Sequence, residues 1–239
     1  MSTLPEMEDE KSILRWGGLA GILGGVLLII VFGIVAVFVG PDPVELEGWV
    51  TRFPGIRAAR TVENSLYLLV LLLWAVHALA LYQALRRSRP APALFGTGLG
   101  ILGFTVMAAG ALPHVATVPL SDLYHAPGAS PETQATLALL WRATWGIFEA
   151  LLGAGLFAVT IGVLALGAAM VGAAGFGRRT GWVSIGLGGI GIAATLVFFI
   201  DPPSPVAALA VFALIIFHLV VGWKLFKLGR AGQEPQRRE

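Results

Sequence analysis

The stretch from Pro131 to Arg179 constrains this chain most, because it is the longest apolar run and carries charged residues in its interior. Between Thr136 and Gly177 the only ionisable residues are Arg142 and Glu149. They stand two helical turns apart, so both side chains leave one face of a helix. That face continues through small residues against which another helix can pack closely: Gly146, Gly153, Thr160 and Gly167.

The whole chain shares this apolar character. Of its 239 residues, 56% are hydrophobic and 13% are charged, and the mean hydropathy is +0.82. This leaves too little polar surface for a soluble globule, so we expect an all-α integral membrane protein. A formal net charge of +2 gives no indication of nucleic-acid binding. Zero cysteines exclude disulfides and thiolate metal sites, which leaves histidine as the only strong nitrogen ligand.

Apolar runs long enough to cross the hydrocarbon core predict six transmembrane helices, arranged as three hairpins. The expected ranges are 16–39, 62–85, 92–112, 131–172, 180–200 and 206–226. They form a transmembrane domain over residues 14–228, between a disordered acidic tail, 1–13, and a basic tail, 229–239. Ser130 and Pro131 fit the cap and first turn of the fourth helix.

Two segments between these helices are predicted to lie outside the membrane. Residues Pro43 to Thr61 predict a polar lobe with a short helix lying on the surface. Residues His114 to Glu132 predict a proline-rich loop. The fourth helix is too long for a bilayer, so its first turns are expected to project or break away from it.

The basic residues predict the orientation. Twelve Lys and Arg fall on the side of the two termini, and Arg52, Arg57 and Arg60 fall on the other. The positive-inside rule therefore places both termini in the cytoplasm. We expect a multi-pass protein of a bacterial inner membrane, with the bilayer as its first partner.

His77 and His218 are the sharpest signal inside the apolar spans. Each stands nine residues before a cytoplasmic cation, Arg86 or Lys227, so both belong at a similar depth on parallel helices. Such a pair can ligate a b-type haem, can carry protons or bind substrate in a transport cavity, or can join helices structurally. No cofactor is predicted from this pattern alone, and haem b stays an open alternative.

Other polar residues suggest weaker sites. Glu149 joins His77 and His218 in an intramembrane polar cluster, while Glu63 and Arg142 are expected to form an ion pair across the second and fourth helices. His114, Asp122 and His125 make too weak a pattern to predict a metal site.

Glycine patterns are better explained by packing than by chemistry. Gly186 to Gly191 matches GxGxxG but lies inside an apolar span, without the strand that a dinucleotide site requires. Similar runs begin at Gly18 and Gly98, which is consistent with weakly repeated hairpins or with convergent use of small residues. Nucleophile, zinc-protease and phosphate-loop motifs are absent, so no enzyme activity is predicted.

The segment Leu166 to Val183 resembles the helix exit and re-entry of a bacterial family of six-span membrane proteins classed as a domain of unknown function. Gly175-Phe176-Gly177-Arg178 matches the family's turn without its proline, and Thr180-Gly181-Trp182 stands at the re-entry. The resemblance implies the architecture over residues 14–228 and supplies no active site.

Three functions follow from these patterns. The first is a non-enzymatic membrane module, which acts as an accessory or regulatory subunit of other membrane proteins or binds a small hydrophobic ligand. The second is a secondary transporter that uses Glu149, His77 and His218. The third is an electron-transfer subunit with a haem b held by both histidines.

Overall fold

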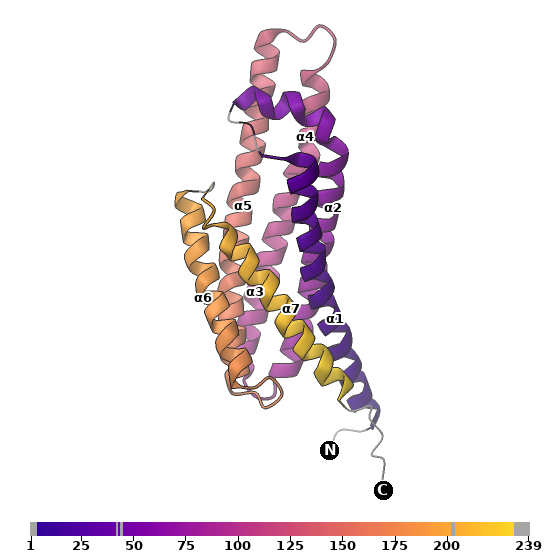
Figure 1. Cartoon of the computed structure of the whole chain (residues 1–239), viewed down its shortest axis with the longest axis vertical. Helices are drawn as coiled ribbons and strands as arrows, with labels where there is room; N and C mark the ends of the chain where they lie inside the picture. The colour runs from indigo at the N-terminus through magenta and orange to yellow at the C-terminus, as the bar shows by residue number, and fades with distance from the viewer. Residues whose placement is uncertain (1–3, 42, 44, 202–203, 232–239) are drawn as a thin grey trace.

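The computed structural model describes residues 4–41, 43, 45–201 and 204–231, and all regular structure in these ranges is helical. Figure 1 shows a long bundle with the two chain ends at one end of it. The elements are α1 (Leu4–Ile34), a π-helical extension η1 (Val35–Val39), α2 (Leu46–Leu85), α3 (Pro90–Ala111), α4 (Pro113–Tyr124), α5 (Pro131–Val171), α6 (Arg178–Ile200) and α7 (Ala208–Arg230).

Six helical segments within the described ranges are long and apolar enough to cross a membrane. They are α1 with η1, α2, α3 with α4, α5, α6 and α7. The predicted class, an all-α multi-pass membrane protein with six spans, is confirmed. Within the bundle, α5 packs along α3 and α6, and α1 packs along α2 and α7.

The small-residue face of α5 packs against α6, as the sequence suggests. A Cβ atom on Gly153 would lie 2.7 Å from the Phe199 ring, and one on Gly167 would lie 2.7 Å from the Ile185 nitrogen. Because α6 ends at Ile200, near the level of Gly153, the face continues beyond it uncovered. Arg142 lies on that uncovered part and is exposed, which explains how this face tolerates charge.

Helices α3 and α5 approach each other through two pairs of glycines. A Cβ on Gly96 would lie 2.7 Å from the Gly162 carbonyl oxygen, and one on Gly162 would lie 2.7 Å from that of Gly96. Gly103 and Gly155 repeat this relation at 2.6 and 2.7 Å. Backbone therefore meets backbone at both crossings, which only glycine permits.

Two helices extend far beyond the ends of α3 and α6. Gly110, near the end of α3, contacts Leu151 of α5, so the part of α5 from Pro131 to Glu149 projects about 27 Å at 1.5 Å per residue. We call this part, together with α4 and residues 46–63 of α2, the distal lobe. In Figure 1 it lies opposite the chain ends, with the first turns of α2 lying across it. Pro54 lies inside α2, where a missing backbone bond favours a bend.

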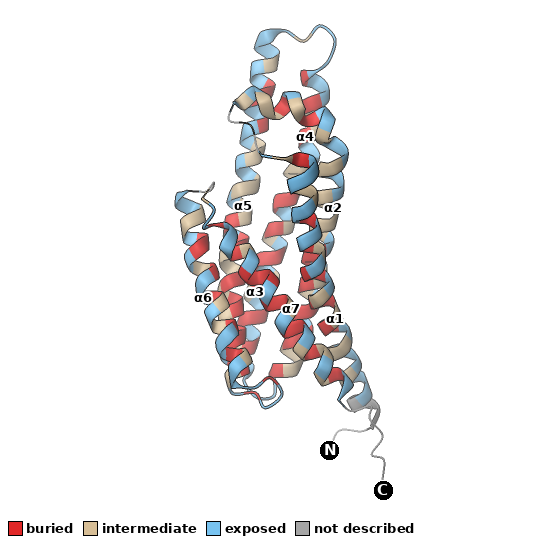
Figure 2. Ribbon diagram, in the orientation of Figure 1, coloured by how far each residue is buried: buried red, intermediate tan, exposed pale blue. Residues whose placement is uncertain are grey.

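Most buried apolar residues belong to two clusters, and Figure 2 shows buried residues both among the membrane-spanning helices and in the distal lobe. The larger cluster lies among the membrane-spanning helices and includes Trp74, Leu156 and Phe217. The smaller one lies in the distal lobe and consists of Val50, Phe53, Tyr124, Leu137, Ala138 and Trp141. The lobe therefore has an apolar core of its own.

Two sequence-based expectations about the ends of helices were wrong. Residues 4–13 belong to α1 rather than to a disordered tail, because they have packing partners: Glu10 lies 3.6 Å from Arg87. A Cβ on Gly229 would also lie 2.8 Å from the Lys11 carbonyl. Residues 1–3 of the first tail and 232–239 of the basic tail lie outside the described residues, whereas residues 229 and 230 complete α7.

The segments predicted as lobe and loop are also more helical than expected. Residues 113–124 form α4, because Pro113 occupies a first-turn position where its missing N–H costs nothing. The second helix begins at Leu46 rather than at residue 62, and includes the expected surface segment. The fourth predicted helix agrees closely, and the Ser130 side chain accepts a hydrogen bond from the Thr133 nitrogen at 3.2 Å.

Candidate functional site

The structure brings His77 of α2 and His218 of α7 into contact. Their ring centroids lie 5.0 Å apart in an edge-to-face arrangement of 62°, and both residues are buried, with exposures of 0% and 2%. Trp74 stacks on His218 at 4.1 Å and 6°. The His77 Nδ1 lies 2.8 Å from the Gly17 carbonyl oxygen of α1. Since a carbonyl only accepts, Nδ1 carries the proton.

Helix α1 makes room for these rings with glycines. A Cβ on Gly21 would lie 2.6 Å from the His77 Nδ1, and one on Gly24 would lie 2.6 Å from the Trp74 Nε1. Among the described residues, no partner bonds either nitrogen of His218 or the Nε2 of His77. The pair is thus held by packing and by one hydrogen bond.

A haem does not fit between these histidines. Axial ligation requires the two ligating nitrogens to face each other about 4 Å apart, across the plane of a macrocycle. Here the rings meet edge to face at 5.0 Å, and the cavity beside them measures about 10 Å³, roughly the space of one water. The geometry fits the alternative in which the two histidines join helices structurally.

Glu149 does not join this pair. The α5 residues that line the space beside His77 and His218 begin at Val159, ten residues farther along the helix, or about 15 Å. Glu149 instead accepts a hydrogen bond from the Trp145 Nε1 at 3.0 Å, one turn earlier on its own helix. The predicted cluster of three is therefore divided between two levels of the bundle.

The expected Glu63–Arg142 ion pair was also wrong. Arg60 Nη1 lies 3.0 Å from a Glu63 carboxylate oxygen, with both side chains 16% exposed, whereas Arg142 is exposed. The two partners stand one turn apart on α2, so they meet without depending on how helices pack.

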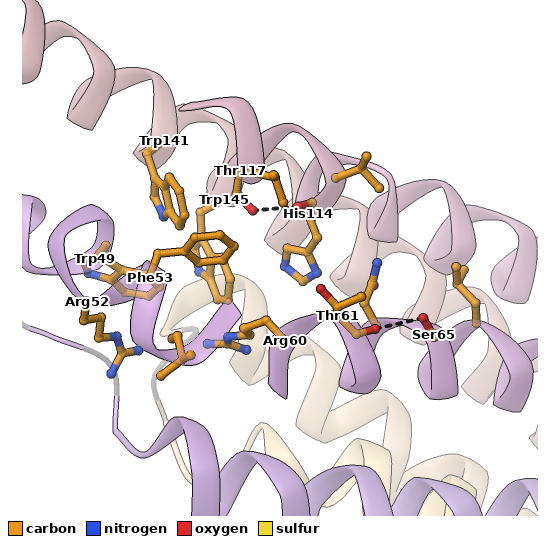
Figure 3. Close-up of a pocket in the computed structure, with 15 residues that line it drawn as sticks. Trp49, Arg52, Phe53, Arg60, Thr61, Ser65, His114, Thr117, Trp141 and Trp145 are labelled. Atoms are coloured by element: carbon orange, nitrogen blue, oxygen red, sulfur yellow. Dashed lines mark hydrogen bonds between the residues drawn. The ribbon is translucent and has the colours of Figure 1, made fainter. Parts of the chain in front are cut away.

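A pocket of about 310 Å³ opens in the distal lobe between α2, α4 and α5. Its wall includes two aromatic residues of α2, Trp49 and Phe53, and two of α5, Trp141 and Trp145, each two spaced one helical turn apart (Figure 3). The rings of α2 contact those of α5. Trp49 lies 4.8 Å from Trp145, and Phe53 lies 4.9 Å from Trp141, between ring centroids. We call this space the lobe pocket. Its polar lining consists of Arg52, Arg60, Thr61, Asn64, Ser65, His114 and Thr117.

The arginines of the lobe pocket are placed by specific contacts. The Arg60 guanidinium lies 5.5 Å from the centroid of the Trp145 ring, as Figure 3 allows the reader to follow. Arg52 donates to the Pro41 carbonyl oxygen at 2.6 Å, which holds the connection between η1 and α2 against the lobe. Both guanidinium groups therefore border the pocket in defined orientations.

A second, apolar cavity of about 210 Å³ lies below the lobe pocket, between the membrane-spanning helices. Most of its lining is aliphatic or aromatic, and Trp74, which stacks on His218, lies at its wall. Asn64 and His114 line both cavities, so the two spaces are neighbours with these residues between them. The apolar cavity is lined by Leu28, Val31, Phe32, Val35, Glu63, Asn64, Tyr67, Val70, Trp74, Met107, His114, Phe148, Leu152, Leu156, Val211 and Leu214.

Several buried polar atoms along these cavities have no hydrogen-bond partner in the described part of the chain. They are the Nε1 atoms of Trp141 and Trp74, the hydroxyl of Tyr67 and the Nε2 of His114. Buried polar groups normally find a partner. Four buried polar atoms without a described partner therefore belong to residues that line the two cavities.

His114, Asp122 and His125, the three residues of the weak metal pattern, have separate partners. His114 packs on the Phe148 ring at 4.4 Å, Asp122 pairs with Arg57 at 3.0 Å, and His125 Nδ1 lies 2.8 Å from the Ser121 carbonyl. The search of the described residues found no group of three metal-ligating side chains.

With the six apolar spans and the geometry of the cavities described, comparison with known proteins tests the family resemblance. A family model described as a domain of unknown function, DUF4386, matches residues 19–227. The chain belongs to this family. No curated protein and no solved structure matches it. For this DUF4386 member, then, the family confirms the architecture, and any function must be argued from the site itself.

Sequence reasoning missed the lobe pocket of this DUF4386 protein. Trp49 with Phe53 and Trp141 with Trp145 each show an i, i+4 spacing that places two rings on one helix face. Two such pairs in segments flanking the membrane indicate two helix faces that can pack on each other. The prediction of residues 43–61 as a surface lobe, rather than as the start of α2, concealed this indication.

Proposed function

We propose that this protein is a non-enzymatic membrane module that binds a small hydrophobic molecule in the two neighbouring cavities of the lobe and the membrane domain. One observation carries the proposal: cavities of about 310 and 210 Å³ share Asn64 and His114 in their linings. The aromatic walls of the lobe pocket and the mostly apolar lining of the second cavity match the composition of small-molecule sites. An accessory or regulatory role toward other membrane proteins is compatible with ligand binding of this kind.

The position of the cavities favours an elongated ligand. The apolar cavity lies level with the ends of α3 and α7, and the lobe pocket lies in the part of the bundle that projects beyond α3 and α6. An amphipathic molecule would place its apolar part among the membrane helices and its polar part in the lobe, as it does at a bilayer surface.

We further propose that both termini are cytoplasmic in a bacterial inner membrane, which places the distal lobe on the periplasmic side. The support is the excess of Lys and Arg at the end of the bundle that holds the termini. A reporter fused after Gly229 should then behave as cytoplasmic, and one inserted near Ala126 as external. A cytoplasmic signal from the Ala126 insertion would contradict this orientation.

Tryptophan fluorescence offers a direct test of ligand binding. Of the seven Trp residues, four line the cavities: Trp49, Trp74, Trp141 and Trp145. The other three are exposed by 51% to 61% and would report on lipid. Replacing those three, Trp16, Trp182 and Trp223, by Phe leaves only tryptophans at the cavities. In phosphatidylcholine nanodiscs, 12-bromododecanol should quench this variant saturably, because bromine quenches at contact.

A matched pair of substitutions on α7 separates binding from partitioning into lipid. Val211 lines the apolar cavity, whereas Val220 is 44% exposed on the same helix. Val211→Phe should abolish the saturable quenching, and Val220→Phe should leave it unchanged. Quenching that rises linearly with the probe in the parent variant, or that survives Val211→Phe, would refute the proposed function.

A further inference from the structure

The polar groups that border the lobe pocket are dominated by hydrogen-bond donors. Trp141 Nε1 only donates, is buried with its residue 4% exposed, and has no partner among the described residues. The guanidinium groups of Arg52 and Arg60 also only donate. No Asp or Glu is among the described residues that line this pocket. A ligand with acceptor groups matches this lining.

The neighbouring cavity has the opposite character. Of its lining residues, only Glu63 carries a charge, and that carboxylate is paired with Arg60 at 3.0 Å. The rest of the lining is almost entirely apolar, from Phe148 at the junction with the lobe to Leu156 and Trp74 below. A ligand that extends into this cavity must present an apolar chain there.

We propose that the ligand is a carboxylate-headed amphiphile, with the carboxylate in the lobe pocket against Trp141 and Arg60 and the chain in the apolar cavity. This proposal rests on the proposed function and adds the chemical class of the ligand. A carboxylate has two acceptor oxygens and forms short charge-assisted bonds with donors of both kinds, an indole N–H and a guanidinium.

A ligand that extends from the lobe pocket into the apolar cavity would pass Asn64 and His114, which line both cavities. His114 has its Nε2 unbonded within the described residues and packs between the Trp145 and Phe148 rings, with centroid distances of 5.3 and 4.4 Å. The chain of the amphiphile would therefore leave the lobe beside an imidazole and enter the membrane domain along the Phe148 ring.

A series of head groups on one chain tests this proposal in the variant that keeps only the cavity tryptophans. The probes are 12-bromododecanoate, 12-bromododecanol, 12-bromododecyl phosphate and 12-bromododecyltrimethylammonium, measured at pH 8.5. Each affinity is corrected for the partition of that probe into protein-free discs. The carboxylate should bind at least about tenfold more tightly than the alcohol, and the trimethylammonium probe should bind most weakly.

Two variants address the proposed contacts. Trp141→Phe keeps a ring against Phe53 but removes the donor, so it should weaken carboxylate binding about threefold to tenfold and leave the trimethylammonium probe unchanged. The double variant Arg60→Gln with Glu63→Gln removes the ion pair without leaving a buried unpaired charge. It should remove most of the preference for carboxylate over alcohol.

The outcomes separate this proposal from the proposed function. Equal affinities for all four heads, each lost in Val211→Phe, would overturn the carboxylate class while the binding site stands. Tighter binding of the phosphate or the trimethylammonium probe would also overturn it. Saturable quenching by none of the four probes would overturn both proposals.

Discussion

The glycine contacts between α3 and α5 give a prediction whose size can be derived from the structure. Gly96 and Gly98 are two residues apart on α3. A Cβ on Gly96 would lie 2.7 Å from the Gly162 carbonyl oxygen and 2.9 Å from the Leu166 nitrogen, whereas one on Gly98 would meet nothing within 4 Å. Because the obstacle at Gly96 is backbone, the helices themselves must separate.

Replacing Gly96 and Gly98 by alanine in two separate variants isolates the free energy that the close contact at Gly96 contributes. Alanine gains the same helix propensity, about 1 kcal/mol, at both positions, so it cancels in the difference between the two variants. Overpacking costs about 1–3 kcal/mol. We therefore expect Gly96→Ala to be less stable than Gly98→Ala by about 1–3 kcal/mol, measured by titration with SDS in mixed micelles and followed by circular dichroism.

A double variant provides the refutation. Gly162→Ala would meet the Gly96 carbonyl at the same crossing, so both substitutions demand one separation of α3 from α5. The double variant should cost clearly less than the sum of the two single variants. Stabilities of Gly96→Ala and Gly98→Ala within about 0.5 kcal/mol, the scatter of ordinary surface substitutions, would show that the two helices do not pack as described.

Three further predictions concern the histidine pair and the lobe. His77→Phe should lower the free energy of unfolding by about 1 kcal/mol, because it removes the hydrogen bond to the Gly17 carbonyl. His218→Phe should be neutral or stabilising, because no described residue bonds its ring; equal destabilisation of the two variants in an SDS titration would contradict this. Gly21→Ala should destabilise by displacing the His77 ring, and Gly33→Ala, with open space around it, should not. Arg57→Gln should change the melting temperature little, since its pair with Asp122 is exposed.

The parts of this fold that depend on one helix at a time were predictable from the sequence. Apolar length gave the six spans, and the spacing of Gly153, Thr160 and Gly167 identified the face of α5 that α6 covers. The distances of His77 and His218 from basic residues indicated a common depth, and the two rings do meet. Each of these inferences needs only helical periodicity and the thickness of a bilayer.

The parts that depend on how separate helices meet were not predictable. The predicted lengths of the fourth and fifth helices indicate that α6 is shorter than α5, but they do not show which side chains Glu149 meets, and Glu149 was grouped with the histidines. Prolines suggested a loop where Pro113 starts α4. The two cavities require α2, α4 and α5 to be placed relative to one another, which is a property of tertiary packing alone.

The glycine crossings have a mechanical consequence for the distal lobe. Helix α5 runs unbroken from Pro131 to Val171, and the contacts at Gly155 and Gly162 with α3 lie well toward its other end. A helix in backbone contact at two levels, and covered by α6 between Gly153 and Gly167, cannot pivot easily at either contact. The projecting part of α5 therefore behaves as a beam clamped at one end, and any movement of the lobe must come from bending of the projecting helices rather than from sliding of α5 against α3.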